Sequence, residues 1–257
     1  MTETVLETGL SHWKTHKLYR QNVEFLVEEF CSWKSLLALL DHVYSERDKA
    51  FIATLFLTGG RISEVLQLRK ENFEVRKEEG VILVRNMPLL KRYRKLGTKI
   101  YEDGHKGWET EKLNMTRKTF PIKIGEPLVP ILIDWLNKSE GLLFPSSDKR
   151  RKGKPLTRFW AYNTIIRLDR TLPETLKIDL GLNKPFIKNN VKVSDRLHLW
   201  LHYFRSQRAS QLVTDYGFEI LDLINYFSWE SFETAGHYAH KGWRGLSSKM
   251  ESRSTYF

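Results

Sequence analysis

The chain has 257 residues with a formal net charge of +11. Hydrophobic residues make up 41% and charged residues 28% of it, a balance typical of a globular protein, and no apolar run is long enough to cross a membrane. A single cysteine, Cys31, excludes an internal disulfide, so we expect a reducing, cytoplasmic setting, while the positive charge indicates a polyanionic partner such as nucleic acid rather than charge kept only for solubility.

The first part of the chain is predicted to be helical. Residues 11–30 read as one helix and residues 33–58 as two, because their apolar residues recur at helical spacing. Gly59 and Gly60 should end the last of these with a left-handed C-cap. A further helix is expected at 61–72, with its inner face formed by Ile62, Val65 and Leu66.

The spacing of apolar residues changes from helical to strand-like in the middle of the chain. Strands are predicted in "GVILVRNMPL" (80–89) and "TFPIKI" (119–124), joined by a long basic hairpin. Two helices follow, at 127–137 and 156–172, on either side of a charged loop at 145–155.

The last part of the chain begins with an irregular stretch at 173–196. It should close with three helices at 197–214, 218–227 and 230–243, the last with an inner face of Phe232, Ala235 and Trp243. The fold class predicted is therefore α+β, mostly α-helical, with a small antiparallel sheet between helices.

Several well-known ligand-binding patterns are absent from the sequence. It contains no GxxxxGK[ST] loop, no GxGxxG opening a helix, no CxxC and no HExxH. We therefore expect no cofactor, no metal site of these types, and phosphate chemistry that rests on cationic side chains.

Three segments contain candidate site residues. In "LTGGRISEVLQL" (57–68), Arg61 begins a helix, where an anion is favoured, and Glu64 can hold its guanidinium from one turn on. In "LHYFRSQRASQLV" (201–213), His202 and Arg205 lie three apart, so both can grip one phosphate from the same helix face. In "SWESFETAGHYAH" (228–240), Tyr238 carries the only hydroxyl with a plausible route to a phosphate held by the arginines. Each segment alone is better explained by ordinary packing or surface pairing.

Taken together and in this order, the three segments resemble the tyrosine recombinase (phage integrase-like) family, whose pattern is TGxRxxE, HxxR, a His or Trp, and a nucleophilic Tyr nine residues later. Trp229 stands nine residues before Tyr238, so the resemblance, which covers roughly residues 35–245, makes Trp229 the His/Trp position and leaves His237 and His240 without a role. "FRSQRASQL" is similar to integrases of archaeal viruses and plasmids. Residues 1–34 would then be a short N-terminal helical segment and 35–257 the catalytic domain, either a minimal one or a fragment of a longer chain.

The resemblance also implies a catalytic lysine on the hairpin. Lys91 is our first choice, with Lys95 and Lys118 as competitors. Double-stranded DNA is the expected partner, with self-association into a dimer or tetramer on DNA, and without a membrane or a small-molecule cofactor. The basic residues expected to contact DNA are Arg92, Arg94, Lys95, Arg117, Lys118, Arg150, Arg151 and Lys152.

The mechanism that the resemblance implies is a metal- and ATP-independent cleavage and rejoining of DNA. Tyr238 would form a 3′-phosphotyrosine link, Arg61 and Arg205 would stabilise the charge of the transition state, His202 would take or share a proton, and Lys91 would protonate the leaving 5′-oxygen. Two alternatives remain at this stage: a nicking-closing enzyme of the type IB topoisomerase kind, and a catalytically silent DNA-binding relative.

Overall fold

The computed structural model describes residues 30–90, 92–102, 106–182, 186–188, 191–194, 199–200 and 202–236. The helix expected at 11–30 and the part of the last helix beyond Gly236 lie outside these residues, apart from Phe30. Within them, no helix is long and apolar enough to cross a membrane.

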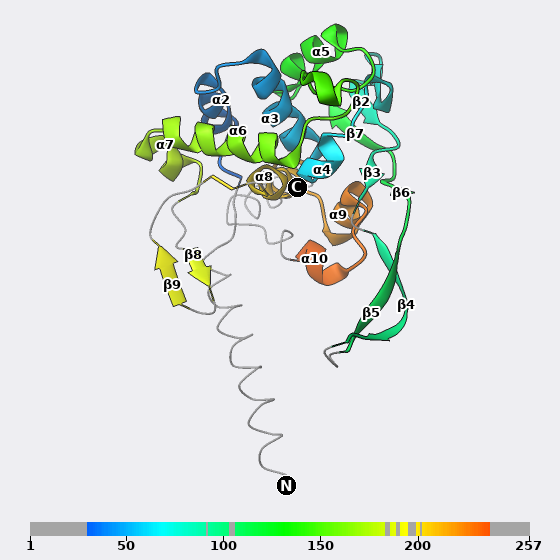
Figure 1. The fold of residues 1–257 in the computed structure, drawn as a ribbon. Coiled ribbons are helices and arrows are strands. Elements are labelled where there is room, and N and C mark those ends of the chain that lie inside the picture. Colours follow the sequence, from blue (N-terminus) through cyan, green and yellow to red (C-terminus); the bar gives the residue numbers. More distant parts are fainter. Residues whose placement is uncertain are drawn as a thin grey trace, which may run out of the picture.

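Helices are the main type of secondary structure in the described part of the chain (Figure 1). They are α2 (Trp33–Asp41), α3 (Glu46–Thr58), α4 (Ile62–Val65), α5 (Val129–Lys138), α6 (Arg158–Thr171), α7 (Glu174–Asp179), α8 (Tyr203–Tyr216), α9 (Ile220–Phe227) and α10 (Phe232–Gly236). Short 3-10 turns lie at Lys70–Asn72 and Lys149–Arg151.

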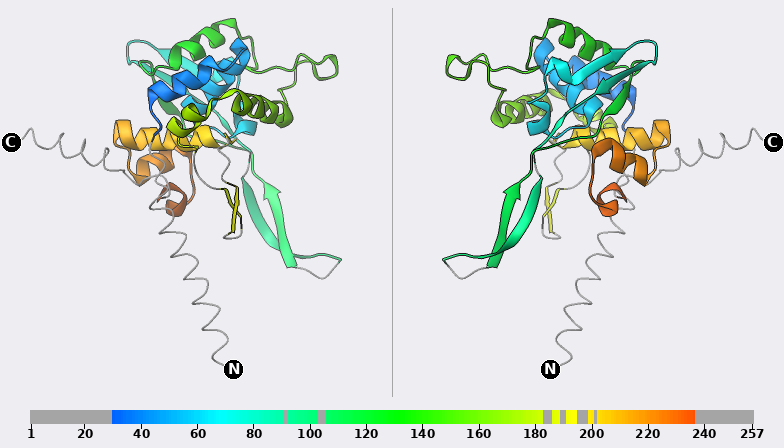
Figure 2. Two further views of the ribbon diagram at one scale, coloured as in Figure 1. Left: turned by 90° about the vertical axis from the view of Figure 1, so that its left-hand side faces the viewer. Right: turned by 90° about the vertical axis from the view of Figure 1, so that its right-hand side faces the viewer.

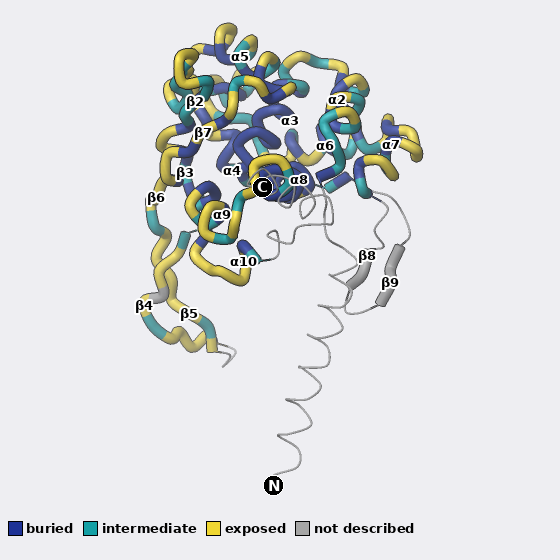
Figure 3. Tube along the Cα trace, turned by 180° about the vertical axis from the view of Figure 1, so that it is seen from behind, coloured by how far each residue is buried: buried dark blue, intermediate teal, exposed yellow. Residues whose placement is uncertain are grey.

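The core is built around α3 and α8, which are buried along most of their length (Figure 3). Helix α3 is apolar on nearly all sides, as expected for a helix surrounded by other elements. Helix α8 differs, because it buries a series of polar side chains: Arg205, Ser206, Gln207, Arg208, Ser210 and Gln211. Buried polar groups are costly unless they are hydrogen-bonded, so this face of α8 must meet partners elsewhere in the core.

A three-stranded antiparallel sheet with the order β1-β2-β7 lies beside the helices; its strands are β1 (Phe73–Arg76), β2 (Val81–Val84) and β7 (Phe120–Lys123). Its register pairs Ile82 with Ile122 and Val84 with Phe120. All four side chains are buried, because alternate residues of a strand face the same side. The sheet thus presents one apolar face to the core.

The chain between β2 and β7 leaves the body of the protein (Figure 2). It passes through a short strand pair, β3 (Pro88–Leu89) with β6 (Met115–Thr116), and then through the hairpin β4 (Tyr93–Ile100) and β5 (Lys106–Lys112). We call this β4–β5 hairpin the arm. It is the long basic hairpin that the sequence predicts, and its exposed side chains include Tyr93, Ile100 and Trp108.

Three expectations about secondary structure are wrong in part. The helix expected at 61–72 is only the single turn α4, followed by the 3-10 turn. The stretch 173–196, expected to be irregular, contains α7 and a hairpin of β8 (Phe186–Lys188) and β9 (Val191–Ser194). On α10, Ala235 is buried as expected but Phe232 is 63% exposed, so Phe232 does not belong to an inner face.

Candidate active site

The site is organised by the turn that follows α3. Gly59 caps the helix with φ 54°, in the left-handed region that favours glycine. A Cβ on Gly59 would lie 2.5 Å from the Phe227 ring, and one on Gly60 would lie 2.1 Å from the methyl group of Met87. Both glycines are therefore required, the first for its backbone angle and both for the close approach of neighbouring side chains.

Arg61 follows directly and is held by Glu64, as the sequence predicts. The backbone N–H of Arg61 donates to Glu64 Oε2 at 2.9 Å, and its Nη1 donates to Glu64 Oε1 at 3.0 Å. The Glu64 side chain is buried, whereas that of Arg61 is 31% exposed. The Glu64 carboxylate thus binds both the backbone N–H at the start of α4 and the Arg61 guanidinium. Part of the guanidinium remains exposed and can bind a ligand.

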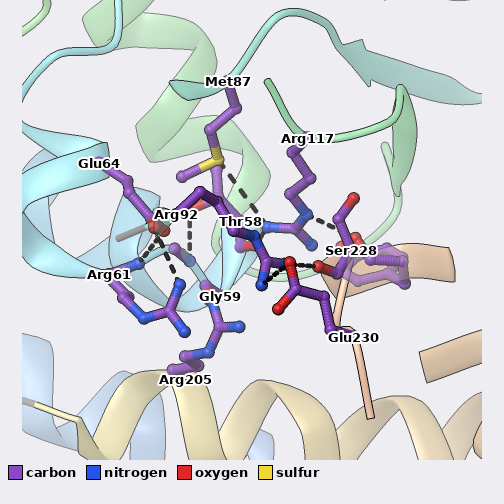
Figure 4. A network of polar contacts seen from close by, with 12 residues as sticks. Thr58, Gly59, Arg61, Glu64, Met87, Arg92, Arg117, Arg205, Ser228 and Glu230 are labelled. Atoms are coloured by element: carbon purple, nitrogen blue, oxygen red, sulfur yellow. Dashed lines mark hydrogen bonds and ion pairs between the residues drawn. The ribbon is translucent and has the colours of Figure 1, made fainter. Parts of the chain in front are cut away.

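The last carbonyls of α3 are taken by three side chains from other elements. Tyr226 Oη donates to the Leu57 carbonyl at 3.2 Å. Arg117 Nη1 donates to the Thr58 carbonyl at 2.6 Å, and Arg205 Nη1 donates to the Gly59 carbonyl at 2.6 Å. A helix C-terminus leaves such carbonyls unpaired and carries negative partial charge. It therefore attracts two buried guanidiniums to the turn that carries Arg61 (Figure 4).

Trp229 lies close to the same turn, in contact with Phe227 and Arg205. Its ring stacks on that of Phe227, with centroids 4.5 Å apart and planes at 11°. The Arg205 guanidinium carbon lies 4.8 Å from the Phe227 centroid and 5.4 Å from that of Trp229. Aromatic faces attract cations, so the stacked pair helps to hold the Arg205 guanidinium that donates to the Gly59 carbonyl. The structure thus brings Arg61, Arg205 and Trp229 together.

His202 lies at the boundary of α8 rather than inside a helix. Helix α8 begins at Tyr203, and His202 is its N-cap residue, with an exposed side chain. The helix expected from residue 197 does not form at Leu199 and Trp200, because the Leu199 N–H is bound by Asp169 at 2.7 Å and Leu199 packs into the core. His202 therefore stands at the surface, one turn before the buried Arg205.

Arg117 is the main correction to the predicted DNA contacts. Its side chain is only 3% exposed and stacks over the Phe120 ring at 3.6 Å, so it faces the core and not a DNA backbone. Its Nε donates to the Tyr226 carbonyl, and its Nη2 is buried without a hydrogen-bond partner in the described part of the chain. Burial lowers the pKa of the guanidinium well below its ordinary value.

A third buried arginine, Arg208, lies on α8 three residues after Arg205. Its Nη1 forms an ion pair with Glu126 at 2.6 Å, and its Nη2 donates to Tyr226 Oη at 2.9 Å. Burial alone would lower the pKa of Arg208, but Tyr226 and Glu126 raise it above the ordinary value. Neither the role of Arg208 nor the buried position of Arg117 was predicted from the sequence. Arg208 stands three residues after Arg205 on one helix face, and this spacing could have indicated that it lies near the site.

Some predicted site residues lie outside the described residues. These are Lys91 and Tyr238, together with His237 and His240, and the side chain of Lys95 is not described either. Lys118, the remaining candidate for the lysine, is exposed, and its Nζ donates to Asn225 Oδ1 at 2.9 Å.

The other predicted DNA contacts are at the surface or close to it. Arg94 is exposed on the arm and pairs with Glu111, and Arg150 and Lys152 are exposed in the 145–155 loop. Arg151 is half-buried and donates to the Pro155 carbonyl at 3.3 Å. Arg92 is different, because its guanidinium is bound to Ser228 and Glu230 within the protein. No group of three or more His, Cys, Asp or Glu residues in the described ranges has the arrangement of a metal site.

Removal of the Glu126 charge should unfold the protein more easily. In Glu126→Gln the buried Arg208 charge loses its partner, so we expect the free energy of unfolding to fall by roughly 3 to 5 kcal/mol. Urea unfolding at constant m-value measures the change. Glu46→Gln is the control, because Glu46 pairs with Lys138 at a similar 2.8 Å but at the surface, and it should have little effect. Equal midpoints for the two variants would contradict the prediction.

The fold is similar to those of several solved structures. Among solved structures, the chain is similar to a XerH site-specific recombinase bound to a palindromic difH substrate in a post-cleavage complex, with 16% identity, a TM-score of 0.50 and coverage of 87% of this chain and 53% of that one. The XerA recombinase (17% identity, TM-score 0.48, 86% and 64% covered) and the Tn1549 transposon integrase in complex with transposon right end DNA (15%, 0.49, 86% and 64%) are also similar.

The chain spans about half the length of the XerH structure that it matches. No curated protein matches it. The likeness to XerH shows a shared fold. The model of the phage integrase family matches residues 30–243, most of the sequence, and the chain therefore belongs to the phage integrase family.

Proposed function

We propose that this protein is a site-specific DNA recombinase or integrase that cleaves and rejoins strands through a 3′-phosphotyrosine intermediate. The observation that carries the proposal is the pair of guanidiniums, Arg61 and Arg205, held by separate elements at the turn after α3. Two fixed guanidiniums suit the negative charge that a phosphate gains during displacement. Stabilisation of such charge is usually the largest catalytic contribution.

The proposed reaction is an in-line displacement. Tyr238 Oη attacks the phosphorus, the bond to the 5′-oxygen breaks, and the 5′-oxygen leaves with a proton supplied by Lys91. His202, exposed at the start of α8, accepts the phenol proton or hydrogen-bonds the phosphate. Rejoining is the reverse attack by a 5′-hydroxyl. Because the phosphotyrosine bond keeps the energy of the broken one, the cycle needs no ATP.

The arm is the part proposed to lie along DNA. Alternate residues of β5 share one face of the hairpin, and this face carries Lys106, Trp108 and Lys112. Their cross-strand partners on β4, which lie on the same face, are Ile100, Thr98 and Tyr93. Glu109 and Glu111 lie on the other face. The first face therefore has no acidic residue in the described strands, and a two-stranded ribbon of this kind fits the major groove of DNA.

We also propose that the protein acts as a dimer or tetramer on double-stranded DNA within the cytoplasm. Each chain supplies one nucleophile. Exchange between two duplexes requires several strands to be cut, and their ends must be held close together by several chains. The 145–155 loop, with Arg150 and Lys152 exposed, supplies further backbone contacts in this proposal.

Tyr238→Phe should abolish covalent attachment to DNA. With a nicked suicide substrate, we expect the wild type to give an adduct that resists SDS, because the cleaved strand cannot be rejoined, and Tyr238→Phe to give none. Tyr44→Phe is the control, since Tyr44 is 93% exposed and should react as the wild type does. An adduct that persists in Tyr238→Phe would overturn the assignment. Plasmids with two sites then separate recombination from relaxation alone.

Arg61→Ala should slow adduct formation by roughly 10²- to 10³-fold, the usual cost of removing one donor to a developing anion. Arg85→Ala is the matched control, because Arg85 also pairs with a carboxylate, Glu74, at 2.7 Å, but on the sheet. Single-turnover rates measure both variants. A rate for Arg61→Ala within threefold of the wild type would exclude a role in the transition state.

The arm should set part of the salt dependence of DNA binding. Each lysine that contacts a phosphate contributes roughly 0.9 to the slope of log affinity against log salt. We therefore expect the double variant Lys106→Ala, Lys112→Ala to lower the slope by about 2 if both contact phosphates. Lys138→Ala on α5, at the opposite end of the molecule (Figure 1), should leave it unchanged. Binding titrations at several salt concentrations test this, and equal slopes for all three proteins would remove the arm from the interface.

A further inference from the structure

The root of the arm binds the turn between α9 and α10. This turn begins at Ser228, which caps α9 with φ 51° and ψ 46°, a left-handed conformation that is uncommon for a residue other than glycine. The turn is bound to α9 by the N–H of Trp229, which donates to the Ile224 carbonyl at 3.1 Å. Ser228 is also bound by residues of the chain that leads into and out of the arm.

The outgoing chain contributes Arg92, next to the first residue of β4. Its Nη2 donates to the Ser228 carbonyl, and its Nη1 forms an ion pair with Glu230 at 2.7 Å (Figure 4). The Arg92 side chain is 13% exposed, whereas that of Glu230 is 71% exposed. Both ends of the guanidinium fork are thus used by the turn, and neither is presented to a DNA phosphate.

The returning chain contributes Arg117 and Lys118, directly after β6. The Lys118 N–H donates to Ser228 Oγ at 3.0 Å, and Arg117 Nε donates to the Tyr226 carbonyl. Ser228 is therefore bound through its carbonyl by one end of the arm and through its hydroxyl by the other. A displacement of the arm acts on the turn at both points.

The turn leads directly to the residues of the site. Trp229 follows Ser228 and packs on Phe227 and Arg205. Glu230 then precedes α10, whose last residue, Gly236, stands two residues before Tyr238 in the sequence. The position of the turn therefore determines where the segment that leads to the proposed nucleophile begins and in which direction it runs.

We propose that Arg92 is a positioning residue which, through the Ser228 carbonyl and the Glu230 carboxylate, couples the arm to the segment that carries Trp229 and leads to Tyr238. DNA bound along the arm then helps to set that segment for cleavage. The inference rests on the proposed function, in which Tyr238 is the nucleophile and the arm meets DNA.

The coupling and a simple DNA contact by Arg92 predict different cleavage rates for one variant. Glu230→Gln removes a negative charge and the ion-pair partner of Arg92. If Arg92 served as a phosphate contact, DNA affinity would rise and cleavage would not slow. If Arg92 positions the turn, affinity stays the same or rises while cleavage at saturating DNA slows, because small displacements of a reacting group cost large factors in rate.

The experiment is a single-turnover measurement of adduct formation on the nicked suicide substrate, with DNA affinity measured in parallel. We expect Glu230→Gln to lower the rate at saturating DNA at least tenfold without weaker binding. Glu233→Gln is the matched control, since Glu233 is an exposed carboxylate on α10 outside the ion pair, and it should keep the wild-type rate. Wild-type cleavage by Glu230→Gln would overturn the inference and leave the proposed function intact.

A charge exchange supplies the rescue. Arg92→Glu alone should slow adduct formation as Glu230→Gln does, because two carboxylates then face each other. The double variant Arg92→Glu, Glu230→Arg restores the ion pair but not the hydrogen bond to the Ser228 carbonyl, so it should recover part of the lost rate. A double variant as slow as Arg92→Glu would show that the pair does not act as a unit, and would count against the coupling.

Amide exchange provides a readout that needs no cleavage. On addition of intact duplex DNA, we expect protection of residues 229–236 to rise in the wild type and to rise less in Glu230→Gln. The same change in both proteins would overturn the coupling even if no adduct formed. Absence of an adduct in the wild type, by contrast, would overturn the proposed function.

Discussion

The C-terminus of α3 is the constraint on which the rest of the site depends. Its carbonyls at Leu57, Thr58 and Gly59 accept hydrogen bonds from Tyr226, Arg117 and Arg205, which belong to three different elements. Each of these bonds satisfies a group that a helix end leaves unpaired. Together they fix α9, the chain before β7, and α8 around one turn, so the end of a single helix defines where the cationic groups stand.

The same arrangement explains how cations remain buried in this core. An isolated buried charge is very costly, and Arg117 and Arg205 lie close enough for each to disfavour the other's charge. The negative end of α3 offsets part of this repulsion. Glu64 also stabilises the charge of Arg117, and the aromatic rings of Phe120 and Phe227 cover the guanidinium planes. The polar face of α8 is therefore a requirement of the site and not an anomaly of packing.

The sequence allowed the local parts of this structure to be predicted. The left-handed cap at Gly59, the Arg61–Glu64 pair, α3 and the basic hairpin all depend on residues close together in the chain. The buried position of Arg117 does not, because its acceptors are backbone carbonyls 59 and 109 positions away. In the basic run that contains it, nothing distinguishes a core arginine from a surface one. The start of α8 was misjudged for a similar reason, since Asp169 binds the Leu199 amide from another helix.

The groups proposed to stabilise the phosphate charge and the proposed nucleophile are carried by parts of the protein with different supports. Arg61 and Arg205 stand on buried elements whose positions are set by several bonds each, which suits charge stabilisation that must be in place before the reaction. The path to Tyr238 runs through a turn held by the Arg92 side chain and by the backbone N–H of Lys118. In the proposed coupling, this turn responds to DNA bound along the arm while Arg61 and Arg205 keep their positions. If Tyr238 is the nucleophile, as proposed, a site divided in this way holds its cationic groups in place before the reaction and cleaves only once the nucleophile is brought into line.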